Sequence, residues 1–185
     1  ATLTQRKFYR VTGGSTQNKG VIPDIRLVDI YNEEFGERKA KNALKWDTIP
    51  TAPFKREGSV QPYVAKLNQT SGQRVATDPQ FKYLETRKTL AKKTADEKKV
   101  VLDIDQRRAE LVDLEKQTLD AENQRRAATG QPPYANWESY QASIDALVES
   151  RAKMKAHLRP PLPEEEAFIT EAANVLLDYA ALQGR

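Results

Sequence analysis

The most regular hydrophobic pattern in the chain lies near its C-terminal end. Pro163 is followed by three glutamates and then by apolar residues spaced three or four apart, which places their side chains on one face of a helix. Acidic residues in a first turn stabilise a helix because they oppose the positive end of its dipole. The pattern predicts a helix that ends near Gly184, with an apolar face that we expect to be core: Phe168, Ile169, Ala172, Ala173, Leu176, Leu177 and Ala180.

Four earlier segments also have helical spacing. Asp78 can cap a helix that has Pro79 in its first turn, and Asn136 can cap another. Gly72 is expected to interrupt or end the first of the four, because glycine is a poor helix former. The four predicted helices cover residues 60–72, 78–95, 106–128 and 136–158.

Two segments favour extended structure. Residues 3–11 carry large apolar groups on both faces of a strand, which is typical of a strand buried in a larger sheet. Gly13 and Gly14 allow a tight turn after it, so residues 8–25 are predicted as strand, loop and strand. Apolar and acidic residues alternate near the end of the segment 99–105, which favours a short strand there. The predicted fold class is α+β and predominantly helical: a short β-portion at the N-terminus, followed by a helical C-terminal domain with one short strand.

Residues 31–58 have no sustained periodicity and contain several glycines and prolines, so they are predicted to be a connector. We expect Trp46 and Phe54 to pin this connector, because a tryptophan in an irregular segment is more often a packing anchor than a ligand platform. The chain is thereby divided into residues 1–30, the connector, and a helical domain over residues 59–185.

The composition is that of a polar chain with a modest core. Of its 185 residues, 38% are hydrophobic and 30% are charged, and the mean hydropathy is -0.74. We expect neither a signal peptide nor a membrane anchor, because no run approaches the roughly 20 apolar residues that a spanning helix needs. The chain has no cysteine, which excludes disulfides and thiolate metal sites.

The net charge of +4 does not indicate a nucleic-acid partner. Basic residues in the helical part are interspersed with acids at helical spacing, as in Asp103 with Arg107 and Glu122 with Arg126. Such alternation is typical of a solvated helix face, and a concentrated basic stripe is absent. We therefore expect no binding of nucleic acid.

The most specific motif lies between Phe8 and Ile25. It contains two glycines, a short polar run and a second turn before an apolar pair: Gly13-Gly14-Ser15-Thr16-Gln17, Lys19-Gly20 and Val21-Ile22-Pro23. This segment closely resembles the end of the protease domain in tail-specific (C-terminal processing) proteases. Residues 42–47 resemble a second motif of the long bacterial members, with Lys45 where those proteins carry proline. The helix start at residues 78–81 and the long charged helices resemble the C-terminal extension of that family.

The resemblance implies a function for a larger protein. Family members are serine endopeptidases with a Ser-Lys dyad, and both residues of the dyad lie upstream of the glycine loop. Ser15 belongs to the loop motif rather than to the nucleophile motif, and no lysine in this chain matches the general base. We therefore assign no catalytic, cofactor-binding or metal-binding residue to the chain. The resemblance identifies the chain as the C-terminal part of such a protease, with residues 1–30 closing the protease domain.

The resemblance also implies partners and a location. Family members are periplasmic, and they bind non-polar C-terminal tails of substrate proteins through a separate PDZ domain upstream. A periplasmic adaptor lipoprotein and peripheral association with the periplasmic face of the inner membrane are further implied. We expect the helical domain to support substrate access or partner docking, and we expect this part of the protein to be inactive by itself.

Other interpretations have less support in the sequence. A stand-alone, non-catalytic helical protein-interaction module would need a self-sufficient N-terminus. A small hydrolase that uses Ser15 would need a base within hydrogen-bond reach, and the chain offers scattered lysines and one distant histidine, His157. Calcium binding would use acids spaced like ligands, but the EF-hand glycine and terminal glutamate are absent; these acids are Asp96, Glu97, Asp103 and Asp105.

Overall fold

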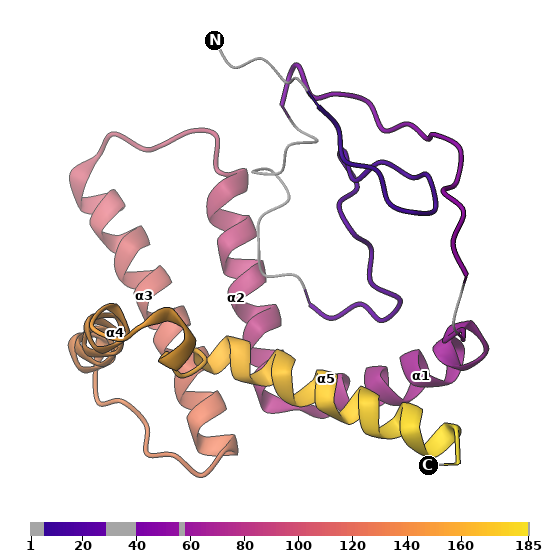
Figure 1. The fold of residues 1–185 in the computed structure, drawn as a ribbon. Helices are drawn as coiled ribbons and strands as arrows, with labels where there is room; N and C mark the ends of the chain where they lie inside the picture. The colour runs from indigo at the N-terminus through magenta and orange to yellow at the C-terminus, as the bar shows by residue number, and fades with distance from the viewer. Residues whose placement is uncertain (1–5, 29–39, 56–57, 185) are drawn as a thin grey trace.

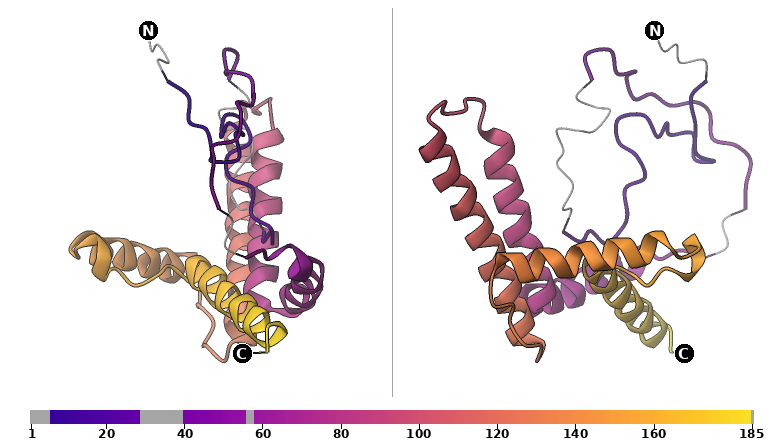
Figure 2. Two further views of the ribbon diagram at one scale, coloured as in Figure 1. Left: turned by 45° about the vertical axis from the view of Figure 1, so that its right-hand side comes forward. Right: turned by 90° about the vertical axis from the view of Figure 1, so that its left-hand side faces the viewer.

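A computed structural model describes residues 6–28, 40–55 and 58–184. The helices in these ranges are α1 (Gln61–Thr77), α2 (Pro79–Asp96), α3 (Ile104–Ala128), α4 (Trp137–Ala152), the 3₁₀ turn η3 (Ala156–Leu158) and α5 (Pro163–Leu182). Helices α2 and α3 form a hairpin, and α1 and α5 pack side by side and antiparallel near its base (Figure 1). Helix α4 contacts α3 and otherwise projects away from the hairpin (Figure 2).

The helix starts follow the local capping signals of the sequence. The Asp78 carboxylate accepts from the Gln80 N–H at 2.7 Å, which caps α2 as predicted. The Asn136 side chain accepts from the Ser139 N–H at 2.9 Å, which caps α4 as predicted. In α5, the Glu165 carboxylate reaches back to accept from the N–H of residue 162 at 2.6 Å. These contacts satisfy backbone donors that a helix end leaves free.

The core is small and lies where α2 meets α3 and α5. Its buried residues in the described ranges are Phe81, Tyr83, Leu84, Ala121 and Ala167, and Leu67 of α1 and Tyr140 of α4 are buried outside this cluster. The Phe81 ring meets the Phe168 ring of α5 edge to face, with centroids 5.7 Å apart. Within the described part of the chain, no helix is both long enough and apolar enough to cross a membrane.

The prediction that Gly72 interrupts or ends the first helix is wrong. Helix α1 continues through this residue to Thr77. An interior glycine costs about 1 kcal/mol relative to alanine, which neighbouring contacts can offset. Contacts on both sides of Gly72 favour the helix, since Ser71 is 2% exposed and Arg74 is ion-paired to α5.

The predicted strand at residues 99–105 is also absent. Residues 97–103 form an irregular connection between α2 and α3, and Leu102 is 97% exposed. The Asp103 carboxylate accepts from the Gln106 N–H at 2.9 Å and starts α3 instead. An alternating pattern needs a neighbouring strand to satisfy its backbone groups, and this connection at the hairpin tip has none among the described residues.

The predicted β-portion at the N-terminus is wrong as well. In residues 6–28 and 40–55 the structure has two isolated antiparallel bridges, Tyr9 with Ser15 and Gly14 with Thr48, and no strand. Residues 3–5 of the predicted first strand lie outside the described ranges. The fold class of the described chain is therefore helical rather than α+β, because a strand that is short of neighbours does not extend into a ladder.

The expectation that the apolar face of α5 is core is correct only in part. Ala167 is buried and Phe168 packs against the core. In contrast, Ile169, Leu176 and Leu177 are 59%, 66% and 69% exposed. Helix α5 turns its charged residues Glu171 and Asp178 toward α1, so most of its apolar stripe faces outward.

Candidate functional site

The glycine loop of residues 13–17 is held by residues 46–49. The Ile49 N–H donates to the Gly13 carbonyl at 2.9 Å, and the Ser15 N–H donates to the Asp47 carbonyl at 3.0 Å. Gly13 has a φ of +84°, and a Cβ at this position would overlap the Ile49 carbonyl. A side chain is therefore excluded at position 13 by both conformation and space. The two motifs that carried the sequence resemblance are in direct contact.

Trp46 joins these two segments. Its Nε1–H donates to the Ser15 carbonyl at 2.8 Å, and the Lys19 ammonium lies 3.6 Å from the centroid of its ring. The Asn18 amide adds a hydrogen bond to the Leu44 carbonyl at 2.8 Å. Trp46 and Phe54 are 40% and 44% exposed, so neither side chain is buried as a packing anchor. Trp46 instead ties residues 42–47 to the loop through its indole hydrogen bond and its contact with Lys19.

A polar cluster at the edge of the loop ties residues 7–9 to the same segment. The Tyr9 hydroxyl donates to Asp47 at 3.1 Å, and the Lys7 ammonium lies 3.1 Å from the same carboxylate oxygen. Loss of solvation and the neighbouring Asp47 carboxylate raise the pKa of Tyr9. The Tyr9 hydroxyl is the hydrogen-bond donor in this cluster.

Ser15 supports the loop and is not presented as a nucleophile. The residue is 4% exposed, and its Oγ accepts from the Gln17 N–H at 3.0 Å. A hydroxyl in such a turn satisfies the backbone and faces away from solvent. His157 lies exposed on η3, and Asp105 is exposed beside Arg108. Within residues 6–28, 40–55 and 58–184, no group of three or more His, Asp or Glu side chains could hold a metal ion.

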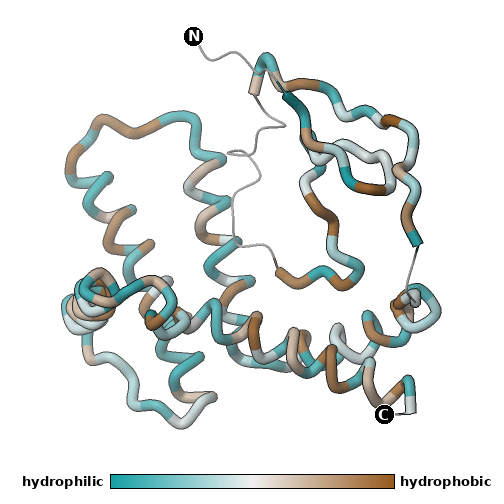
Figure 3. Tube along the Cα trace, in the orientation of Figure 1, coloured by the Kyte–Doolittle hydropathy of each residue, from teal (hydrophilic) through white to brown (hydrophobic). Residues whose placement is uncertain are grey.

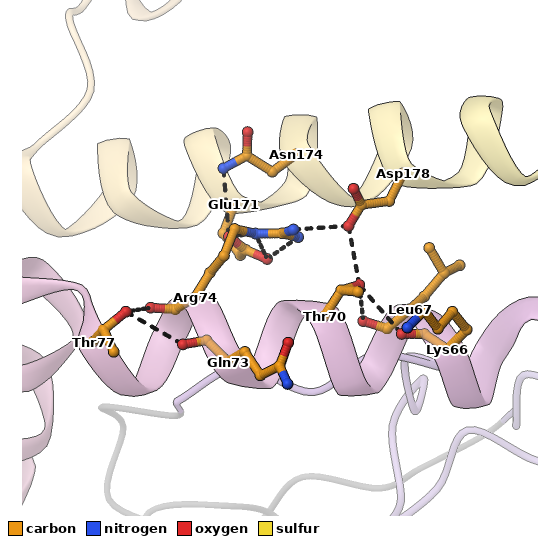
Figure 4. A network of polar contacts seen from close by, with 9 residues as sticks. All are labelled: Lys66, Leu67, Thr70, Gln73, Arg74, Thr77, Glu171, Asn174 and Asp178. Carbon is orange, nitrogen blue, oxygen red and sulfur yellow. Dashed lines mark hydrogen bonds and ion pairs between the residues drawn. The ribbon is translucent and has the colours of Figure 1, made fainter.

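The helical part is joined by an ion-pair network between α1 and α5 (Figure 4). The Arg74 guanidinium donates from Nε and Nη2 to the Glu171 carboxylate, at 3.0 and 2.8 Å, and from Nη1 to Asp178 at 2.8 Å. The Thr70 hydroxyl donates to Asp178 at 3.0 Å. The two acids are seven residues apart, which is about two turns, so they lie on one side of α5. One arginine therefore fixes both the spacing and the register of the two helices.

The electrostatics of this network favour its charged form. Burial by itself raises the pKa of Glu171, but hydrogen bonds from Arg74 and Ser71 outweigh it and leave the pKa lowered. The Arg74 hydrogen bond also lowers the pKa of Asp178, and both acids raise the pKa of Arg74. Glu171 is 4% exposed and Ser71 is 2% exposed. The network is thus charged at neutral pH, with Glu171 buried and Arg74 and Asp178 about one third exposed.

A second buried ion pair lies within α3, and its arginine also reaches α2 through one hydrogen bond. The Arg125 guanidinium donates to Glu122 at 2.8 and 2.6 Å, and to the Gln80 side chain of α2 at 2.9 Å. It also lies 5.5 Å from the centroid of the Tyr83 ring. Both charged side chains are 6% exposed. These contacts build a framework of fixed helices and offer no reacting group.

Sequence reasoning missed both networks, although a signal for the first was present. Glu171 and Asp178 recur at a helical spacing on the side of α5 opposite its large aliphatic residues. Two acids on one side of a helix indicate a basic partner, but the sequence does not say that this partner is Arg74.

Residues 30–181 match a family described as the C-terminal domain of tail specific protease. The chain belongs to this family. It is also similar to the tail-specific protease of Haemophilus influenzae, with 40% identity over 112 residues. That match covers 58% of this chain and 16% of the relative, so the chain spans about a sixth of the length of the curated relative it matches. The resemblance of this C-terminal domain to tail-specific proteases is therefore confirmed.

Proposed function

We propose that the chain is the C-terminal part of a tail-specific serine endopeptidase that degrades or processes proteins with non-polar C-termini. The family match over residues 30–181 carries this proposal, and the contact between the glycine loop and residues 46–49 supports it. In this proposal residues 1–30 close the protease domain, residues 31–58 connect the two parts, and residues 59–185 form the helical domain.

The chemistry in this proposal belongs to a Ser-Lys dyad upstream of the chain. The buried position of Ser15 and its hydrogen bond from the Gln17 N–H support a loop role for this serine. The residues of this chain then act indirectly: the loop shapes the edge of the catalytic domain, and the helices extend from it. The chain by itself is expected to be inactive.

The helical domain would act as a rigid platform for substrate access or partner docking. Support comes from its polar contacts, because Arg74 joins α1 to α5 through several charge-assisted hydrogen bonds, and Arg125 of α3 donates one hydrogen bond to Gln80 of α2. The expected partners are protein substrates with apolar C-terminal tails and an adaptor lipoprotein. The expected location is the bacterial periplasm, on the periplasmic face of the inner membrane.

Removal of residues 59–185 from the complete polypeptide tests this role. The measurement is cleavage of an unfolded substrate that ends in apolar residues, compared with the same substrate ending in acidic residues. We expect the truncated enzyme to lose turnover or its preference for the apolar tail. Unchanged turnover and unchanged preference would contradict the proposed role of the helical domain.

A further inference from the structure

The α2–α3 hairpin ends in an apolar tip that no other described part of the chain covers. Val100, Leu102 and Ile104 are 60%, 97% and 61% exposed. Figure 3 shows hydrophobic positions at this end of the hairpin, with hydrophilic positions on both sides of them. A single exposed apolar residue is ordinary, but a run of them at one end of a hairpin indicates a contact surface.

The tip stands away from the core of its own domain. The buried residues of α2 are Phe81, Tyr83 and Leu84, in the first two turns of the helix. Asp96 ends α2 twelve residues after Leu84, which at the rise of an α-helix is about 18 Å further along the axis. All of residues 96–113 are exposed. The hairpin therefore presents its tip and does not use it for internal packing.

Lysines flank the apolar residues of the tip. They form two pairs, Lys92 with Lys93 at the end of α2 and Lys98 with Lys99 in the connection, and all four are exposed. None of them has an ion-pair partner among the described residues. A lysine can lay its methylene groups along an apolar surface while its ammonium stays at a polar boundary. The tip thus combines apolar residues with free positive charge.

The acids near the tip do not cancel this charge. Residues 92–108 contain six basic and four acidic residues. Asp105 is paired with Arg108 at 3.5 Å. Asp103 accepts from the Gln106 N–H, so it faces the positive end of the α3 dipole. The four lysines outnumber the acids that remain, which leaves the tip positive.

The positive charge decides between the surfaces that an apolar tip could meet. A second copy of the tip would bring lysines of the two copies together, and like charges repel. An anionic bilayer instead offers an apolar boundary to the three large residues and phosphates to the lysines. The combination of charge and hydrophobicity at the tip therefore favours a lipid surface.

We propose that the tip of the α2–α3 hairpin binds an anionic lipid bilayer. Val100, Leu102 and Ile104 enter the headgroup region, and the lysine pairs contact the lipid phosphates. The inference rests on the proposed function for its location, because the polypeptide must meet a membrane face. It names the residues that make that contact, and it makes the contact reversible, because few side chains are buried in the lipid.

Cosedimentation of the complete polypeptide with lipid vesicles tests the contact. One set of vesicles contains phosphatidylglycerol with phosphatidylethanolamine, and the other contains phosphatidylcholine alone. Leu102→Asp changes the tip at a fully exposed position, so it leaves the fold intact. Val148→Asp on α4 is the matched control, because Val148 is also an exposed aliphatic residue, at 58%. A double variant, Lys98→Gln with Lys99→Gln, tests the charge.

We expect binding to the anionic vesicles that is about tenfold weaker in Leu102→Asp and in the lysine double variant, and unchanged in Val148→Asp. Absence of binding, or equal binding by Leu102→Asp and the unsubstituted protein, would overturn the proposal. Equal binding to both kinds of vesicle would also overturn it, because the lysines would then contribute nothing.

Two further outcomes separate this inference from its alternatives. Self-association that Leu102→Asp abolishes, without vesicle binding, would overturn the proposal in favour of a contact between two copies. Cleavage of an apolar-tailed substrate by a polypeptide that binds no vesicles would refute the lipid contact alone. Vesicle binding through the tip by a polypeptide that cleaves no such substrate would refute the proposed protease function alone.

Discussion

Replacement of Glu171 by alanine tests whether the contact between α1 and α5 depends on its buried charge. The wild-type carboxylate is 4% exposed and accepts hydrogen bonds from Nε and Nη2 of Arg74. Glu171→Ala removes these contacts and leaves the guanidinium beside an apolar methyl group. The exposed pair of Glu149 with Lys153 provides the control, because its side chains are 69% and 72% exposed.

The size of the effect follows from what Arg74 retains. Removal of one partner of a fully buried ion pair costs about 3–5 kcal/mol. Arg74 is 33% exposed and keeps its contact with Asp178, so water and the second acid recover part of that cost. Hydrogen bonds to charged groups contribute about 1.5–3 kcal/mol each to stability, and we expect a loss of about 2 kcal/mol for Glu171→Ala. Glu149→Ala is expected to cost less than about 0.5 kcal/mol.

Urea unfolding of the chain, followed by far-ultraviolet circular dichroism at pH 7, measures both variants. The prediction is a lower midpoint for Glu171→Ala with the slope unchanged, and no resolvable shift for Glu149→Ala. If the two variants shifted the midpoint equally, the network would contribute no more than a surface ion pair, and this reasoning would be refuted.

Four further predictions follow from individual residues. The hydrogen bonds from Arg74 outweigh the effect of burial and leave the folded pKa of Glu171 below its ordinary value of 4.5. The stabilisation from this carboxylate is therefore complete above that pH and is lost as the pH falls through the folded pKa. Acid should lower the urea midpoint more in the wild type than in Glu171→Gln. Gly13→Ala should speed proteolytic cleavage near the glycine loop, since strain of about 1–3 kcal/mol opposes its conformation. Leu84→Ala, at a side chain 1% exposed, should cost about 2–5 kcal/mol in urea unfolding, and a cost near zero would contradict the assigned core. Leu102→Ala should cost less than about 0.5 kcal/mol, and a larger loss would show that the hairpin tip is packed.

The helix starts could be predicted because their signals are local. Asp78 and Asn136 accept from backbone groups two or three residues away, so the residues that decide each start lie within one turn. The turn at Gly13 could be predicted for a similar reason. Its φ of +84° is a conformation that favours glycine, and the two adjacent glycines are visible in the sequence.

The errors concern partners that are distant in the sequence. The alternation before Asp105 looked like a strand, but a strand needs a neighbour that this connection lacks within the described residues. The apolar face of α5 looked like core, but Arg74 lies almost a hundred residues from Glu171 and turns that face outward. Periodicity shows that a helix has two sides, and it does not show which side faces its own domain.

Prediction of the side-chain contacts in the glycine loop was limited for the same reason. Ser15 could be placed in the loop motif from the sequence, but its burial and its bond from the Gln17 N–H emerge only in the folded loop. The contact between Trp46 and the Ser15 carbonyl spans 31 residues, which no local pattern encodes.

The central claim is that this chain is the non-catalytic C-terminal part of a tail-specific protease. The most direct measurement compares cleavage of an unfolded, apolar-tailed substrate by residues 1–185 and by the complete polypeptide. We predict cleavage by the complete polypeptide, dependent on a serine upstream of residue 1, and none by residues 1–185. Cleavage by residues 1–185 that is lost in Ser15→Ala would contradict the account.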